Sequence, residues 1–217
     1  GDGSIHNVPI LAGYNAEEGT LFYDSIQMPT VLVPEFPDAL EDRLAYLEEL
    51  YGAEDAAALI KLYGLDDPES YQKAETDMLG DALFGVHMRY LASANVAAGE
   101  PTYLYHFTRV SPSKTQTIGA FHAAEIFFVF GSHSPLAGLT DEDEVLTEAM
   151  GQYWTNFAKT GDPNSAGLTP WPPYAPGTDQ WMTFNPSIEV KAGVRAEKLD
   201  IMERVMVARI EAAVPQI

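Results

Sequence analysis

The chain has 217 residues, enough for one large domain or two small ones, and 46% of them are hydrophobic, so a sizeable core can form and a disordered chain is excluded. It carries 12 Lys and Arg against 32 Asp and Glu, and this net charge of -20 excludes nucleic acids and disfavours anionic membranes as partners. The sequence has no Cys, which excludes disulfides and thiolate chemistry, and no apolar run of the roughly 20 residues that span a bilayer.

The first hundred residues predict one strand followed by helices. Residues 8–14 are a short apolar run, typical of a strand that is buried on both faces of a parallel sheet. Leu residues recur at helical spacing over residues 37–63, and this pattern predicts a helical region. Two acids followed by Pro68 and Glu69 predict a helix that begins at about residue 66 and ends before Gly99.

The rest of the chain predicts a second main strand, a strand pair and two long helices. Strands are expected over residues 101–109, 181–184 and 188–190, and helices from about residue 140 and over residues 196–214. The segment between 161 and 179 is rich in Pro and Gly, and we expect Trp171 and Tyr174 to hold it in place as an ordered loop. The order of elements is that of an α/β protein. Two main strands are few for such a sheet, which suggests a piece of a larger fold.

A pair of acids follows the first strand. Residues 13–22 (Gly-Tyr-Asn-Ala-Glu-Glu-Gly-Thr-Leu-Phe) place the carboxylates of Glu17 and Glu18 in a turn after that strand. Ligands of open α/β sheets bind at the carboxyl ends of strands, so these acids are candidate functional residues. Alternatively, they only stabilise the N-terminal dipole of the helix that follows.

A histidine follows a Gly-containing turn later in the chain. Residues 119–131 (Gly-Ala-Phe-His-Ala-Ala-Glu-Ile-Phe-Phe-Val-Phe-Gly) place His122 just before a strongly apolar stretch. Imidazole is the usual general base at neutral pH, although a lone His on an apolar face is often only a hydrogen-bonded core residue. An acid after one strand and a His after a later strand match the end of the Ser…Asp/Glu…His order of α/β-hydrolases.

Three segments together resemble one known family. Residues 15–19, 119–131 and 153–164, with Trp171-Pro172 and Tyr174 behind the third, resemble the type-B carboxylesterases, which include cholinesterases and bacterial para-nitrobenzyl esterases. The resemblance covers nearly all of the chain but only about the C-terminal two-fifths of a family member. It implies that residues 1–217 are the C-terminal part of a single α/β-hydrolase domain, with a mostly parallel sheet flanked by helices.

The resemblance also implies roles for individual residues. The acid of the family's catalytic triad stands directly before Gly, which matches Glu18 rather than Glu17, and the triad histidine matches His122. Glu125 matches a buried acid that orients or supports the histidine, and the alternative for it is a plain hydrogen-bond acceptor.

The next aromatic residues have two interpretations. Phe127 and Phe128 are candidates for the wall of an apolar substrate pocket, and core packing is the alternative for both.

The nucleophile of the triad is missing from this sequence. None of the ten Ser has Gly two positions before and two positions after it, and the Gly-rich oxyanion loop is also absent. In the family both motifs lie N-terminal to the Glu motif. The resemblance therefore implies a serine hydrolase of small carboxylic esters that needs neither cofactor nor metal. Its partner is the missing N-terminal half of the same protein, without which this chain is expected to be inactive.

Other interpretations stay open at this point. The same fold serves as a catalytically dead interaction domain, although the presence of both Glu18 and His122 favours an enzyme. A metal site built from His122 and Glu125 with His106 or His133 lacks the spacing of known zinc motifs. The last helix fits intramolecular docking or a homodimer equally well. The absence of Cys favours a bacterial protein. Its location is left open and can be cytoplasmic, periplasmic or secreted.

Overall fold

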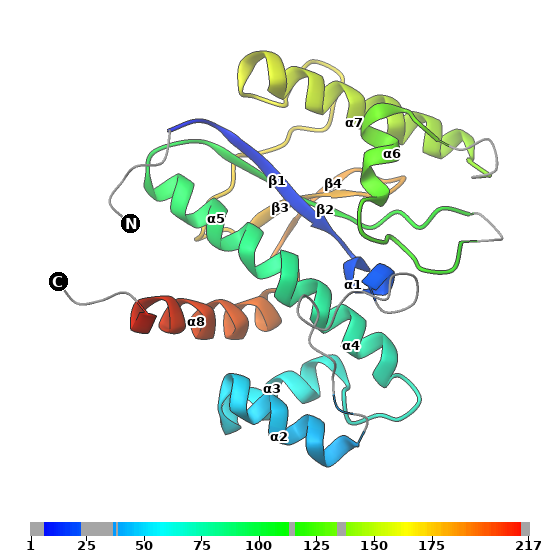
Figure 1. The fold of residues 1–217 in the computed structure, drawn as a ribbon. Helices are drawn as coiled ribbons and strands as arrows, with labels where there is room; N and C mark the ends of the chain where they lie inside the picture. Colours follow the sequence, from blue (N-terminus) through cyan, green and yellow to red (C-terminus); the bar gives the residue numbers. More distant parts are fainter. Residues whose placement is uncertain (1–6, 23–36, 38, 113–115, 134–137, 214–217) are drawn as a thin grey trace. The chain divides into compact units, whose positions relative to one another are not determined.

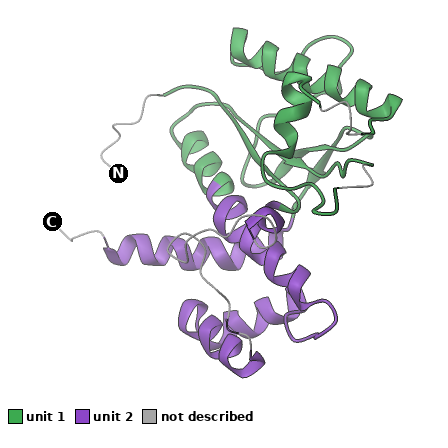
Figure 2. Cartoon of the chain, turned by 45° about the vertical axis from the view of Figure 1, so that its right-hand side comes forward, with its two compact units in different colours: residues 1–17, 88–194 green, residues 18–87, 195–217 purple. Residues whose placement is uncertain are grey.

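The computed structural model describes residues 7–22, 37, 39–112, 116–133 and 138–213. The chain divides into two compact units (Figure 2). Unit 1 consists of Gly1–Glu17 and Met88–Val194, and unit 2 of Glu18–His87 and Arg195–Ile217. Each unit buries apolar side chains of its own.

Unit 1 is built on a four-stranded sheet with the strand order β1-β2-β3-β4 (Figure 1). Its strands are β1 (Ile10–Asn15), β2 (Thr102–Phe107), β3 (Gln180–Phe184) and β4 (Glu189–Ala192). The first three are parallel to one another, and β4 runs antiparallel to β3. All four predicted strands therefore form, and the expected mostly parallel sheet of an α/β protein is confirmed.

The close pairing of β1 with β2 depends on a glycine. Gly13 lies opposite Tyr105, and a Cβ atom at position 13 would lie 2.2 Å from the carbonyl oxygen of Tyr105. A larger residue would force the two strands apart. The apolar run of β1 thus includes a glycine because the neighbouring backbone approaches it closely.

Helices cover both faces of the sheet. On one face lie α6 (Ala124–Phe130) and α7 (Asp141–Thr160), and alternate residues of β2 point toward them. On the other face lies the part of α5 (Val86–Ala97) that belongs to unit 1, where Asn95 donates a 2.9 Å hydrogen bond to the hydroxyl of Thr102. The prediction of a sheet flanked by helices is confirmed.

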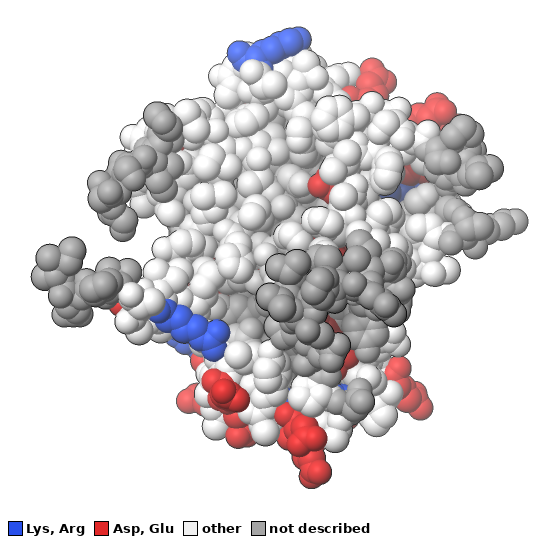
Figure 3. All heavy atoms as spheres, viewed as in Figure 1, with Lys and Arg blue, Asp and Glu red and all other residues white. Residues whose placement is uncertain are grey.

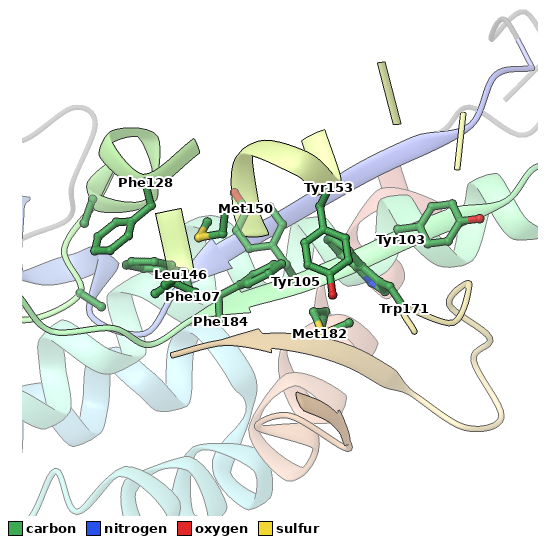
Figure 4. Packing of buried hydrophobic residues seen from close by; sticks show 12 residues of the cluster. Tyr103, Tyr105, Phe107, Phe128, Leu146, Met150, Tyr153, Trp171, Met182 and Phe184 are labelled. Atoms are coloured by element: carbon green, nitrogen blue, oxygen red, sulfur yellow. The ribbon is translucent and has the colours of Figure 1, made fainter. Parts of the chain in front are cut away.

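The core of unit 1 is rich in aromatic residues (Figure 4). Its large members are Tyr103, Tyr105, Phe107, Phe128, Leu146, Met150, Tyr153, Trp171, Met182 and Phe184. Many of the rings meet edge to face, an arrangement that adds to the stabilisation from burial. Trp171 is 1% exposed and Tyr174 is 4% exposed, so both hold the loop 161–179 against the sheet as predicted.

Unit 2 is helical. It contains α1 (Glu18–Thr20), α2 (Leu40–Tyr51), α3 (Ala53–Tyr63), α4 (Tyr71–Gly80), the π-helical turn η2 (Asp81–Gly85), the first two residues of α5, and α8 (Ala196–Ala213). The last helix packs on α3 and η2 and buries Leu199, Ile201 and Met202. The predicted C-terminal helix is confirmed as far as residue 213.

The structure differs from the predicted helices in three places. The helical region over residues 37–63 is two helices, because Gly52 takes a φ of 81° between them. The helix expected at residue 66 begins at Tyr71, since the carboxylate of Asp67 accepts hydrogen bonds from the Glu69 amide and the Ser70 hydroxyl in a separate turn. The apolar residues after His122 form helix α6, which the sequence analysis did not predict.

The acidic surface belongs largely to helices. Carboxylate side chains gather over α2 and α3 in the view of Figure 3. Those exposed to solvent on these helices include Glu41, Asp42, Glu48, Glu49 and Glu54. They are spread along solvated helix faces, which is the ordinary place for such charges.

Candidate active site

His122 lies in a short turn between an isolated bridge and helix α6. The bridge joins Glu17 and Phe121 in parallel, directly after the end of β1. Ala123 then takes a φ of 69°, a left-handed conformation that costs a non-glycine residue about 1–2 kcal/mol. Such strain persists only where the surroundings hold the backbone in place. His122 itself is half-buried.

The residues around this turn form a polar network within unit 1. The side-chain amide of Asn15, at the end of β1, donates to the carbonyl oxygen of Phe121 at 2.8 Å and to the Glu125 carboxylate at 2.5 Å. The hydroxyl of Tyr105 lies 3.3 Å from the other oxygen of Glu125. The structure thus brings Glu125 and the His122 turn together through Asn15.

The acids Glu17 and Glu18 fall in different units. Glu17 belongs to unit 1, where its carboxylate accepts a 2.8 Å hydrogen bond from the amide of Ala120. Glu18 begins α1 of unit 2 and is 4% exposed. Glu18 packs closely on α4, because a Cβ atom on Gly80 would lie 3.1 Å from the Cβ of Glu18 and 3.6 Å from its amide nitrogen. Within unit 1, the structure therefore joins Glu17 to the His122 turn.

The two candidate pocket residues have different surroundings. Phe128 is 4% exposed and packs in the core of unit 1 against Phe107, with their ring centroids 5.2 Å apart. Phe127, one residue earlier, is 42% exposed. Phe128 therefore packs in the core, which agrees with the alternative interpretation of this residue. Phe127, in contrast, presents its ring to solvent.

Two further histidines have structural surroundings. The ring of His106 is buried against Tyr14, with centroids 4.8 Å apart. The ring of His133 packs edge-on to Phe128 and hydrogen-bonds the Thr147 hydroxyl at 2.9 Å. Burial lowers the pKa of His133 below its ordinary value, although Asp143 opposes this. Both rings thus serve packing.

Sequence reasoning missed most of the supporting residues. Asn15 lies in the motif of residues 15–19 but carries no predicted role, and no sequence signal marks Tyr105. The one sequence signal for a supporting residue is Asn15, a polar residue at the end of a buried strand. In open α/β sheets, that position faces the ligand site.

Within the described ranges, no three His, Asp or Glu side chains are grouped so that they could hold a metal ion. No helix in the same part of the chain has both the length and the apolar character that a membrane crossing requires.

Comparison with known proteins identifies relatives of this chain. Residues 2–202 match the model of the carboxylesterase family. Mouse carboxylesterase 1C is 33% identical over 180 residues, which are 79% of this chain and 32% of the relative. Rabbit liver carboxylesterase 1 is 40% identical over 118 residues, 52% of this chain and 21% of the relative.

A solved structure leads to the same family. A PNB esterase superimposes with a TM-score of 0.67 and 30% identity, over 89% of this chain and 38% of the esterase. The chain therefore spans about a third of the length of the proteins that it resembles. The family model, the curated relatives and the solved structure agree, and the chain belongs to the type-B carboxylesterase family of the α/β-hydrolase superfamily.

Proposed function

We propose that this chain supplies the Glu and the His of a Ser-His-Glu triad in a carboxylic-ester hydrolase. Residues 1–217 would form the C-terminal part of a single α/β-hydrolase domain, and the remainder would carry the serine. The observation that supports this most directly is the turn of His122. It is half-buried and is held by Asn15, the last residue of β1, and by Glu17 just after that strand.

The proposed reaction is acyl transfer in two steps. His122 takes the proton of the serine hydroxyl as the oxygen attacks the ester carbonyl, and it returns that proton to the alcohol that leaves. His122 then takes a proton from water, whose oxygen attacks the acyl-serine, and the serine regains its proton as the acid departs. Glu18 holds the imidazole in one tautomer and stabilises the imidazolium. The substrate is a small carboxylic ester, and no cofactor takes part.

This chain alone is expected to be inactive. It has no Gly-x-Ser-x-Gly elbow and no Gly-rich oxyanion loop, so both the nucleophile and the oxyanion donors must come from other residues. Phe127 is proposed to contact substrate. Phe128 is proposed to contribute to the substrate pocket indirectly, because its buried ring supports helix α6, which carries Phe127. A homodimer through α8 and a bacterial origin stay predictions.

The test is p-nitrophenyl acetate hydrolysis by the complete protein and by the 217-residue chain. We expect saturable hydrolysis by the complete protein only, with a loss in kcat of at least about 10³-fold for His122→Ala. Glu18→Gln should lower kcat by on the order of 10²-fold or more. The exposed His87 provides a matched control, because His87→Ala should leave kcat unchanged.

Two results would reject this function. One is full activity of the complete protein after His122→Ala. The other is a folded complete protein without any hydrolysis, which would favour the catalytically dead interaction domain. Hydrolysis by the chain alone that disappears in His122→Ala would reject the expected inactivity of the chain, and with it the need for an external serine.

A further inference from the structure

Glu17 contacts the turn before His122 through both its backbone and its side chain. Its backbone amide donates to the carbonyl oxygen of Ala120 at 3.1 Å, and its carboxylate accepts from the amide of Ala120 at 2.8 Å. It also forms the isolated parallel bridge with Phe121. One residue just after β1 thus binds both backbone polar groups of Ala120, two positions before His122.

The same carboxylate lies against Gly119. This glycine has a φ of 73°, and a Cβ atom added to it would lie 2.9 Å from both Cγ and Cδ of Glu17. The side-chain amide of Gln116 also binds Gly119, since it accepts from the Gly119 amide at 3.2 Å and donates to its carbonyl oxygen at 2.6 Å. Two polar side chains, Glu17 and Gln116, therefore contact the backbone of residues 119 and 120.

The far side of His122 is held separately. Asn15 binds the Phe121 carbonyl oxygen and the Glu125 carboxylate, and Ala123 takes its left-handed conformation between them. These contacts restrain the chain after residue 120. Glu17 and Gln116 restrain the chain before it.

We propose that Glu17 is a positioning residue for His122. Its carboxylate holds the Ala120 amide and covers Gly119, which sets the direction in which the His122 side chain leaves the backbone. It acts on the backbone of the turn, whereas the triad acid acts on the imidazole ring. This inference rests on the proposed function, in which His122 is the general base. A base displaced by about 1 Å can lose about 10²-fold in rate, so a restraint of this kind has a measurable effect on turnover.

Two substitutions separate the reach of the side chain from its charge. Glu17→Asp keeps the charge but shortens the side chain by one methylene, so the carboxylate retreats from Ala120. Glu17→Gln removes the charge but keeps an oxygen acceptor at the same reach. Glu17→Ala removes both. Glu54→Asp, at an exposed position, controls for the substitution itself.

The experiment combines kinetics with hydrogen exchange. In the complete protein, Glu17→Asp and Glu17→Ala should lower kcat by about tenfold or more and change KM by less than about threefold. Glu17→Gln should restore most of the turnover. In the same complete protein, the Ala120 amide should exchange at least about tenfold faster in the Asp and Ala variants than in the parent. If Glu17→Ala fails to fold, kcat and Ala120 exchange in Glu17→Asp provide the test of the positioning role.

The outcomes separate this inference from the function on which it rests. Parental kcat in Glu17→Asp, together with faster Ala120 exchange, overturns the positioning role. Loss of turnover in Glu17→Gln with full turnover in Glu17→Asp also overturns it, because Glu17 would then act through its charge. If the parent complete protein hydrolyses no ester, the proposed function fails and the inference falls with it. If the parent hydrolyses the ester and the Glu17 variants lose turnover, the result reports on the role of Glu17 and leaves the proposed function intact.

Discussion

Each compact unit buries an aspartate that is paired with an arginine, and the two carboxylates lie in different local structures. In unit 1, Asp143 is 0% exposed and pairs with Arg109, and in unit 2, Asp81 is 1% exposed and pairs with Arg195. Arg109 binds both carboxylate oxygens of Asp143, at 2.6 and 2.9 Å. The Thr140 amide and hydroxyl each add a bond of 2.9 Å.

The carboxylate of Asp81 has a different set of partners. The Nε atom of Arg195, at 2.6 Å, and the hydroxyl of Tyr63 both donate to the same oxygen, Oδ2. Asp81 lies in η2, between α4 and α5, so the amides around it are engaged in helical hydrogen bonds. Asp143 lies in the first turn of α7, where free amides and the helix dipole both favour a negative charge.

The two pKa values shift in opposite directions. Burial raises the pKa of Asp143, but the hydrogen bonds from Arg109 and Thr140 outweigh it and hold that pKa below its ordinary value. Burial also raises the pKa of Asp81, and there the charge of Arg195 and the hydroxyl of Tyr63 do not reverse the effect. A buried ion pair stabilises the ionised carboxylate only where enough donors replace the lost water.

Removal of each carboxylate tests this difference most strongly. Asp143→Ala should lower the free energy of unfolding by about 3–5 kcal/mol, because Arg109 loses a bidentate partner in a buried site. Asp81→Ala should cost less, about 1–3 kcal/mol, since Arg195 keeps Asp77 at 3.7 Å. Urea denaturation of both variants measures the two values. The exposed first-turn acid Glu144 gives the control, and an equal or larger cost for Asp81→Ala would contradict the comparison.

The pH dependence of stability should separate the two sites by sign. The lowered pKa of Asp143 means that its contribution is present above the ordinary value of 3.8 and is lost as the pH falls through the folded-state pKa. The raised pKa of Asp81 means that its contribution is present below 3.8 and is lost as the pH rises through the folded-state pKa.

Asn variants make this difference measurable. Relative to Asp81→Asn, the parent chain should gain stability as the pH falls toward 3.8. Relative to Asp143→Asn, it should lose stability below 3.8. Each slope is at most about 1.4 kcal/mol per pH unit, the value for one proton. Denaturation at several pH values, with Asp66→Asn as an exposed control, provides the data. Slopes of the same sign would refute the assignment.

The smallest expected effect concerns the cap of α7. Thr140 and Asp143 form a capping box, in which each side chain bonds the backbone amide of the other. Thr140→Ala should cost about 1 kcal/mol, while Thr140→Ser should cost little because it keeps the hydroxyl. The midpoint of thermal unfolding, followed by circular dichroism, measures both. If Thr140→Ala leaves that midpoint unchanged, the hydrogen bonds from Thr140 contribute less to stability than the comparison of Asp143 with Asp81 requires.

The same contrast shows which parts of the fold local sequence predicts. The start of α7 was predicted because its acids and cap stand within one turn of the chain. The four strands were predicted from short apolar and aromatic runs. The start of α4 was misplaced, since the carboxylate of Asp67 closes a turn of its own before Tyr71. The pairing of Asp81 with Arg195 joins residues 114 positions apart, and no local pattern indicates it.

The sequence by itself determined the fold class, the family, and the choice of Glu18 and His122 as candidate residues, because their motifs are short and contiguous. Only the tertiary structure decided what surrounds the His122 turn. Asn15 and Glu17 reach that turn across more than a hundred residues of chain, and Glu125 is held by Asn15 and Tyr105 from two neighbouring strands. These contacts depend on strand order and register, which follow from packing of the whole unit rather than from any one segment.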